Sequence, residues 1–292
     1  RNEYLRMLTG DFAPPHAGAA LAGLVSFGND YVSDALPPWF SYVFTATEMV
    51  APIKAEAAAP DAAPDCRPVG IGECLRRAIV RVALDASRDD VCQYLEPQQL
   101  LVHVKGGATK LVYGMQIVMA QHPDWVLVKL DIRNAYNELS RAAVLDALGR
   151  NPQLAHLVPL ARAELAPESL IRMGRNTDTR SCEGLQQGSV EGTEWFCVTI
   201  HPAVRELDAA LARLGGLARF GADDGYAAGP PTAEFWAALE AFEAALAALK
   251  LELRVDKGAC FSATGDLSGR PPAMPIGDAA SFDGGVAGAR GV

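Results

Sequence analysis

Hydrophobic residues follow two different spacings along the chain, which predict helices over much of its length and a few short strands. From Arg67 to about Val91, and again up to Met119, apolar residues recur at the three- and four-residue spacing of a helix. The run from Trp125 to Leu130 is short and rich in valine and leucine, which is typical of a buried strand. The pattern therefore predicts a mixed fold of helices and strands.

Two further helices are predicted downstream of this strand. Ser140 precedes an apolar stripe and is expected to cap the helix that carries it. Thr232 precedes a helix predicted from Ala233 to Leu249. The apolar stripe of this second helix consists of Phe235, Trp236, Leu239, Phe242, Leu246 and Leu249. We expect this stripe to lie in the core and to cover a sheet.

Proline, glycine and alanine mark the breaks between these elements. Residues 1–50 suggest short helices around a Pro37-Pro38 break, and residues 55–65 form an alanine- and proline-rich loop. The longest apolar run near the start, roughly residues 17–27, is shorter than the ~20 residues of a membrane-spanning helix. We therefore expect a protein without a membrane span, and the initial Arg1 suggests a piece of a longer chain.

Composition narrows the class of protein further. The chain has 292 residues, of which 50% are hydrophobic, so it can bury a sizeable core. Six cysteines lack any CxxC pair or histidine cluster, which argues against a zinc site and favours reduced thiols in an intracellular protein. The net charge of −9 argues against a generic nucleic-acid binder. Five arginines within residues 67–88 nevertheless predict a local basic face.

Carboxylates stand at two places where strands are expected to end. Asp131 follows the strand up to Leu130, and Asp223 and Asp224 lie in a predicted hairpin turn. Taken singly, each is also an ordinary turn residue. Adjacent like charges repel unless a cation lies between them, and a third carboxylate completes an oxygen ligand set that suits Mg²⁺. The sequence therefore predicts a magnesium site.

A glycine-rich segment lies between the two carboxylate sites. Gly184, Gly188 and Gly192 recur every four residues just before an apolar run. Glycine allows the backbone to approach a ligand closely. A loop leading into a core helix explains the apolar run but not the glutamines Gln186 and Gln187 beside the glycines.

The order of these segments resembles the reverse transcriptase family, and its non-LTR retrotransposon and retroelement branch in particular. Motif A of that family, an aspartate followed five residues later by an aromatic residue, matches Asp131 and Tyr136. Motif C, an Ala-Asp-Asp hairpin, matches Ala222, Asp223 and Asp224.

The remaining motifs of the family also match in order, over roughly residues 54–260. Motif B matches Gly184, Gln187, Gly188 and Ser189, motif D places Lys257 at the family's lysine position, and the fingers pattern matches Lys54, Arg67, Pro68 and Val69. The segment "PQQ…GGATK" is similar to the one that precedes motif A in this branch.

The resemblance implies an α+β right-hand polymerase fold, with an antiparallel palm sheet packed on helices, fingers, and a thumb that is largely absent. Its implied ranges are fingers over 1–120, palm over 121–265, and a flexible C-terminal segment over 266–292 that begins a primer grip. The implied activity is that of an RNA-directed DNA polymerase (a nucleotidyltransferase) that acts on an RNA template, a DNA primer and deoxynucleoside triphosphates. The implied location is intracellular, and nuclear if the chain comes from a eukaryotic retroelement.

The resemblance also implies a role for each matched residue. Asp131, Asp223 and Asp224 would hold two Mg²⁺ ions, with Mn²⁺ as the alternative. Tyr136 would lie under the sugar and clash with a 2′-hydroxyl, and Gln187 and Gly188 would contact the nucleotide. Lys54, Arg67 and Lys257 would grip the triphosphate or protonate pyrophosphate.

Two departures from the family pattern leave alternatives open. Gly221 stands where the family usually has tyrosine or phenylalanine, and Val190 where proline is common. One alternative is therefore a degenerate, catalytically inactive fragment, and another is an RNA-binding scaffold on the same fold. A third, an RNA polymerase on a similar palm, is disfavoured by Tyr136.

Overall fold

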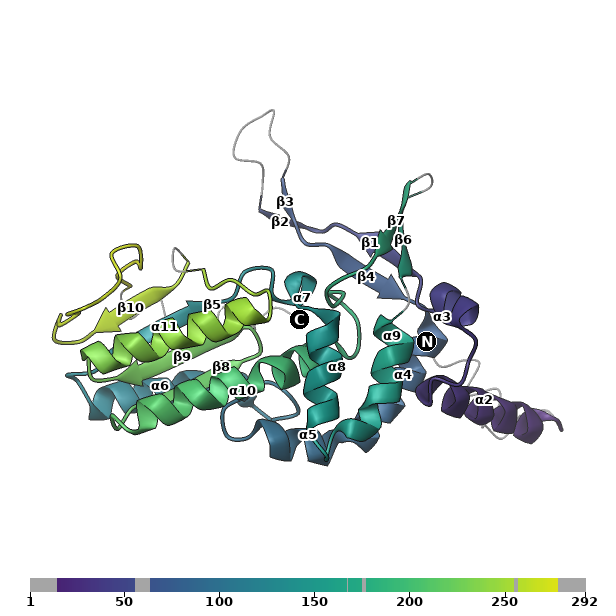
Figure 1. Cartoon of the computed structure of the whole chain (residues 1–292), viewed down its shortest axis with the longest axis horizontal. Coiled ribbons are helices and arrows are strands. Elements are labelled where there is room, and N and C mark those ends of the chain that lie inside the picture. The colour runs from purple at the N-terminus through teal and green to yellow at the C-terminus, as the bar shows by residue number, and fades with distance from the viewer. Residues whose placement is uncertain (1–14, 56–63, 167, 175–176, 255–256, 278–292) are drawn as a thin grey trace. The chain divides into compact units, whose positions relative to one another are not determined.

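The computed structural model describes residues 15–55, 64–166, 168–174, 177–254 and 257–277, and the chain divides into two compact units. The first unit combines residues 1–85 with 156–182, and the second combines 86–155 with 183–292 (Figure 1). Each unit is thus built from two stretches that are distant in the sequence. The expected fingers and palm ranges follow different breaks and stay predictions.

The second unit is organised around a four-stranded antiparallel sheet. Its strands are β5 (Val126–Asp131), β8 (Leu217–Gly221), β9 (Asp224–Gly229) and β10 (Ala259–Ser262), in the order β10-β5-β9-β8. All three pairings between neighbours are antiparallel. The strand expected up to Leu130 and the antiparallel sheet packed on helices are both present.

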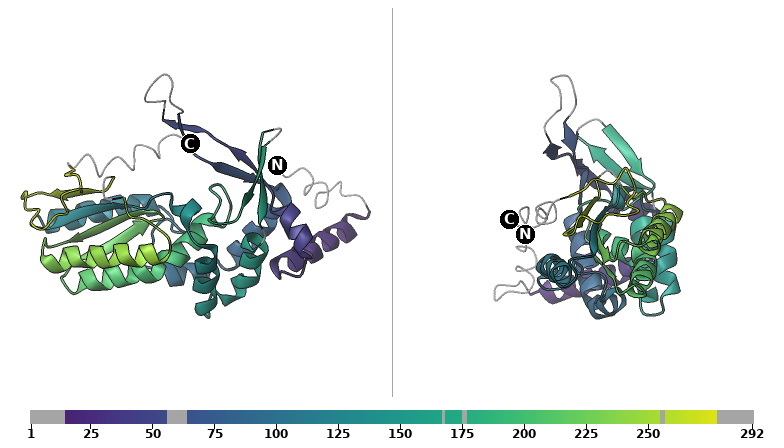
Figure 2. Two further views of the ribbon diagram at one scale, coloured as in Figure 1. Left: turned by 45° about the horizontal axis from the view of Figure 1, so that its top comes forward. Right: turned by 90° about the vertical axis from the view of Figure 1, so that its left-hand side faces the viewer.

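Helices cover both faces of this sheet, and side chains alternate between these two faces along each strand. On one face, α6 (Gly107–Gln121) packs Leu111, Met115 and Met119 against a cluster that includes Leu127 and Tyr226. On the other face lie α10 (Gly192–Ala212) and α11 (Ala233–Ala248), which run side by side (Figure 2). The rings of Phe220 on β8 and Phe242 on α11 meet there at 5.5 Å between centroids.

The two helices predicted from caps are present, although only one cap bond forms. The Thr232 side chain accepts a hydrogen bond from the Phe235 backbone N–H, and the stripe of α11 is buried up to Leu246. Ser140 occupies the N-cap position of α8 (Arg141–Arg150), but its side chain makes no capping bond. Ser140 therefore occupies the position before the first residue of its helix but does not cap the helix with its side chain.

Shorter segments complete the second unit. They are α5 (Arg88–Leu95), α7 (Ala135–Glu138) and residues 263–277, which follow β10. Of the C-terminal segment 266–292, the structure describes residues 266–277, in which the Ser268 carbonyl accepts a hydrogen bond from the Trp236 indole at 2.7 Å and Met274 is buried. The flexibility expected of 266–292 stays a prediction. Among the helices in the described residues, none combines the length and the apolar composition needed to cross a bilayer.

The first unit has its own four-stranded sheet. Its strands are β1 (Thr47–Val50), β4 (Val69–Gly72), β6 (Ser169–Met173) and β7 (Thr177–Ser181), in the order β4-β1-β6-β7, and β2 (Ile53–Ala55) pairs separately with β3 (Asp65–Cys66). Its helices are α2 (Ala17–Val32), α3 (Pro38–Phe44), α4 (Cys74–Ala86) and α9 (Val158–Leu165), and the 3-10 turn Ala155–Leu157 precedes α9. The predicted loop 55–65 lies largely outside the described residues.

The helix predicted to start at Arg67 begins only at Cys74, so that part of the prediction is wrong. Residues Val69–Gly72 form β4 instead, because each of them pairs with a residue of β1. The hydrogen bonds of a sheet come from a distant part of the chain, and spacing along the sequence does not reveal them.

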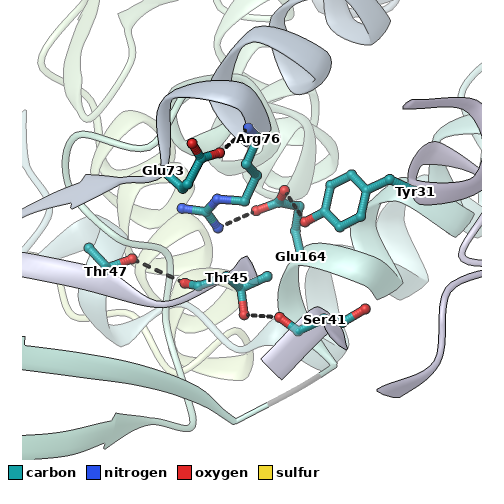
Figure 3. Close-up of polar contacts among 7 residues, drawn as sticks. All are labelled: Tyr31, Ser41, Thr45, Thr47, Glu73, Arg76 and Glu164. Atoms are coloured by element: carbon teal, nitrogen blue, oxygen red, sulfur yellow. Dashed lines mark hydrogen bonds and ion pairs between the residues drawn. The ribbon is translucent and has the colours of Figure 1, made fainter. Parts of the chain in front are cut away.

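A buried ion pair joins α4 to α9 within the first unit (Figure 3). The Arg76 guanidinium donates from Nη1 to Glu164 Oε2 at 2.9 Å, and the Tyr31 hydroxyl donates to Glu164 Oε1 at 2.6 Å. The guanidinium fills the space where a side chain at Gly72 would stand. Arg76 is thus removed from the basic face expected over residues 67–88.

Arg76→Met is expected to destabilise the protein by about 3–5 kcal/mol, because it leaves the buried Glu164 carboxylate without its cation. Chemical unfolding followed by circular dichroism measures this cost. The matched control is Arg150→Met, which breaks an exposed pair with Asp146 and should cost less than about 0.5 kcal/mol. Equal losses in the two variants would contradict the role of Arg76.

His201, in the middle of α10, is fully buried against the ring of Tyr94, with 4.7 Å between the ring centroids. Burial, with a smaller contribution from the charge of Arg205, lowers the pKa of His201 to about 4 from 6.5. The unfolded chain therefore takes up a proton on this imidazole at a pH where the folded chain does not.

The free energy of unfolding should accordingly fall as the pH drops from about 6.5 to 4. His201→Gln should flatten this slope, whereas His16→Gln, at an exposed site, should leave it unchanged. Urea unfolding at a series of pH values measures both slopes. An unaltered slope in His201→Gln would show that another group carries the pH dependence.

Candidate functional site

The ends of β5 and β9 bring two of the predicted carboxylates together. Asp131 and Asp224 are cross-strand partners in the antiparallel pair. Lys129 lies on the same face of the sheet, and its Nζ is 3.9 Å from Asp224 Oδ1. The pKa of Asp224 is raised by partial burial and by the negative charge of Asp131, while Lys129 acts in the opposite direction. This strand end favours a neutralising cation.

The third carboxylate, Asp223, lies in the turn that joins β8 to β9. Gly221 pairs with Asp224, so Ala222 and Asp223 are the two residues of a tight hairpin. Ala222 has φ 61°, in the left-handed region, which costs about 1–2 kcal/mol for a residue with a Cβ. The predicted hairpin at motif C is therefore present, and one of its residues is held in an unfavourable conformation.

The glycine before this turn has a packing explanation. A Cβ at Gly221 would lie 2.9 Å from the side chains of both Leu101 and Leu111. An aromatic residue at this position would displace these leucines. The neighbouring Phe220 is fully buried on the opposite face, with its ring over Gly225. The aromatic ring of this hairpin therefore packs in the core.

Tyr136, in α7, lies beside the hairpin carboxylates. Its ring packs on Phe196 with 5.2 Å between centroids, and its hydroxyl is 3.4 Å from Thr193 Oγ1. Burial raises the pKa of Tyr136 to about 12, and the negative charge of Asp223 adds to the effect. The phenol therefore remains protonated at neutral pH next to Asp223.

The glycine-rich loop is tied to the helix that carries Tyr136. The Leu185 backbone N–H donates to the Tyr136 carbonyl at 2.7 Å, and Arg141 Nε, from the first residue of α8, donates to the Gly184 carbonyl at 3.0 Å. Gly184 has φ 74°, and a Cβ there would collide with the backbone carbonyl of Asn137. The close approach of backbone expected at these glycines is therefore present at Gly184, where the loop backbone contacts the backbone of α7.

Gln187 and Gly188 follow in the same loop, immediately before α10. A turn closes there through the Ser189 N–H, which donates to the Gln186 carbonyl at 3.1 Å, and Gly188 has φ 94°. Gln187 is half-buried and Gly188 is exposed. Motifs A, B and C therefore meet within the second unit.

Three further predicted residues come from other segments of the chain. Lys257 is exposed and stands two residues before β10, whose first residue Ala259 pairs with Lys129, so it lies at the same end of the sheet as Asp131. Lys54, in β2, and Arg67, which is exposed, belong to the first unit. Their roles toward a nucleotide stay predictions.

The donor set at the strand ends is chemically suited to a hard cation, because carboxylate oxygens are the ligands Mg²⁺ prefers. Within the part of the chain that the structure describes, no group of three or more histidine, cysteine, aspartate or glutamate side chains is gathered as a metal site. Metal binding by Asp131, Asp223 and Asp224 therefore stays a prediction.

Residues without an assigned role in the sequence pattern hold the site in place. They are Gln99, Arg141, Thr193 and Phe196. Gln99 is fully buried and bonds to the backbone of Ala222. Its only signal in the sequence is its place in the "PQQ" segment.

Among solved structures, the chain is similar to the apo telomerase of Candida tropicalis, truncated from its C-terminal domain. The match has a TM-score of 0.52 and 9% identity, and it covers 74% of this chain and 50% of that one. The chain thus spans about half the length of that structure. No protein-family model and no curated protein matches the sequence.

Telomerase is related to the reverse transcriptases, so this likeness shows a reverse-transcriptase-like polymerase fold for the chain. At 9% identity it shows the fold alone. The assignment of this chain to the retroelement branch, its reaction and its substrates are therefore proposals.

Proposed function

We propose that the chain is the polymerase domain of a retroelement reverse transcriptase, which adds deoxynucleotides to a DNA primer on an RNA template. The observation that carries this proposal is the meeting of motifs A, B and C in one unit. Asp131 and Asp224 are paired across two strands, Asp223 is in the adjoining turn, and Tyr136 lies beside it. The reverse-transcriptase-like fold supports the same conclusion.

In the proposed reaction, the primer 3′-oxygen forms a bond to the α-phosphorus of the incoming nucleotide. The bond from that phosphorus to the pyrophosphate oxygen breaks, and the hydroxyl proton passes to solvent water. Two Mg²⁺ ions, when bound, would neutralise the attacking and leaving oxygens. The role of Asp131, Asp223 and Asp224 is to hold and orient these ions, and catalysis is chiefly positioning and charge neutralisation.

Tyr136 is proposed to select the sugar. Its ring is fixed by Phe196 on one side and its hydroxyl lies near Thr193, so it presents a rigid surface beside Asp223. A rigid ring excludes an extra hydroxyl by contact, because the ring cannot move aside without losing its own packing. Gln187 and Gly188, from the loop tied to α7, are proposed to contact the nucleotide.

A second candidate is an inactive reverse-transcriptase-like fragment that acts as an RNA-binding scaffold. The net charge of −9 favours the loss of polymerase activity, since a polymerase must bind a polyanion, but it argues equally against the RNA binding of a scaffold. An extension assay separates the two candidates, because a scaffold binds RNA without forming product.

Asp223→Asn is expected to reduce primer extension on an RNA template by about 10²-fold or more, because it removes a charged metal ligand. The assay uses the full chain with Mg²⁺ or Mn²⁺ and a homopolymer template. Asp146→Asn, which changes an exposed aspartate of α8, should retain activity. Wild-type extension by Asp223→Asn would end the ligand assignment, and an inactive wild-type protein would favour the scaffold.

Tyr136→Ala should weaken discrimination against ribonucleotides by roughly tenfold or more, because the ring that would meet the 2′-hydroxyl is gone. The ratio of kcat/KM for the two nucleotide types measures this discrimination. Tyr136→Phe keeps the ring and should keep the ratio, as should Tyr113→Ala at an exposed site on α6. An unchanged ratio in Tyr136→Ala would remove its selective role.

A further inference from the structure

The left-handed conformation of Ala222 requires support from outside the hairpin. Tight two-residue hairpins usually have glycine, asparagine or aspartate where φ is positive, and alanine has no side chain that could bond to its own backbone. Ala222 nevertheless adopts φ 61° immediately before Asp223. Something must therefore hold this residue in place.

The side chain of Gln99 meets both polar groups of the Ala222 backbone. Gln99 Oε1 accepts a hydrogen bond from the Ala222 N–H at 3.2 Å, and Gln99 Nε2 donates to the Ala222 carbonyl at 3.5 Å. Gln99 has no solvent-exposed surface. Hydrogen bonds of a buried amide persist because the lost bonds would not be replaced by water.

Gln99 is itself held on the hairpin by its neighbours. Gln98 to Leu100 lie parallel to β8: the Phe220 N–H donates to the Gln98 carbonyl at 2.7 Å, and the Leu100 N–H donates to the Phe220 carbonyl at 2.8 Å. The Gln98 side chain donates to Asp208 Oδ2 at 2.8 Å, and Asp208 Oδ1 accepts from the Ala218 N–H at 2.9 Å. The glutamine thus projects from a backbone that is fixed to the same hairpin.

We propose that Gln99 is a positioning residue that clamps the Ala222–Asp223 turn and thereby holds Asp223 where the reaction requires it. The clamp on the turn is a property of the fold, whereas its effect on catalysis rests on the proposed function. Gln99 acts through the backbone of Ala222, so it contacts neither the metal nor the nucleotide.

The substitution that tests the clamp is Gln99→Met, which keeps the size of the side chain and removes both hydrogen bonds. Hydrogen exchange at the Ala222 amide, measured by NMR on the full chain, should become at least about fivefold faster. Gln98→Met, on the same segment, removes the side-chain bond to Asp208 but keeps the backbone bonds to Phe220 and both bonds of Gln99 to the turn, so its Ala222 exchange should stay within about twofold. Equal exchange in Gln99→Met and the wild type would overturn the proposal.

Primer extension tests the consequence for catalysis. Below its melting temperature, Gln99→Met should lose about tenfold or more in kcat with an unchanged KM for nucleotide, because a small displacement of a catalytic group lowers the rate strongly. Adding Ala222→Gly should restore part of kcat, since glycine adopts a positive φ without help. An equal loss of kcat in Gln98→Met would overturn the positioning role. So would a Gln99→Met protein that has a lower melting temperature but an unchanged kcat.

The two measurements separate the two ideas. If the wild-type chain does not extend a primer, the proposed function fails, and hydrogen exchange at Ala222 still decides whether the clamp exists. If the wild type is active, and Gln99→Met has the same hydrogen exchange at Ala222 and the same primer extension as the wild type, then the clamp is refuted and the proposed function stands.

Discussion

The antiparallel pairing of β5 with β9 is the constraint on which the candidate site depends. It sets Asp131 opposite Asp224 and keeps both on one face with Lys129. A slip of one residue would turn Asp224 to the opposite face. On the other side of β9, packing holds the register with β8, because the ring of Phe220 lies over its partner Gly225, where a larger residue could not fit. The core thus fixes which side chains the strand ends present.

The hairpin shows how a site and a core can share one short segment. Its aromatic residue, Phe220, is directed into the core against Phe242, and Gly221 makes room for Leu101 and Leu111. Two leucines from another part of the chain thus occupy the space beside Gly221, where the family usually has an aromatic residue. This departure from the family pattern has a packing explanation and leaves all three aspartates in place.

Charge is distributed differently in space than along the chain. The arginines of residues 67–88 predict a local basic face, yet Arg76 is buried and paired with Glu164, whereas Arg67 is exposed. A buried guanidinium next to a carboxylate contributes to the packing of the first unit and is not available to phosphate. The burial of each arginine therefore decides whether its charge is available to a ligand.

The sequence by itself determined the local elements and the order of the candidate motifs. The strand ending at Asp131, the hairpin at Asp223 and Asp224, and α11 with its Thr232 cap all follow from spacing and turn chemistry, which act between near neighbours. Only the tertiary structure decided that Val69–Gly72 is a strand, that Arg76 is buried and that Gln99 reaches Ala222. These depend on contacts between residues up to 123 positions apart, as for Gln99 and Ala222, and no local pattern encodes such contacts.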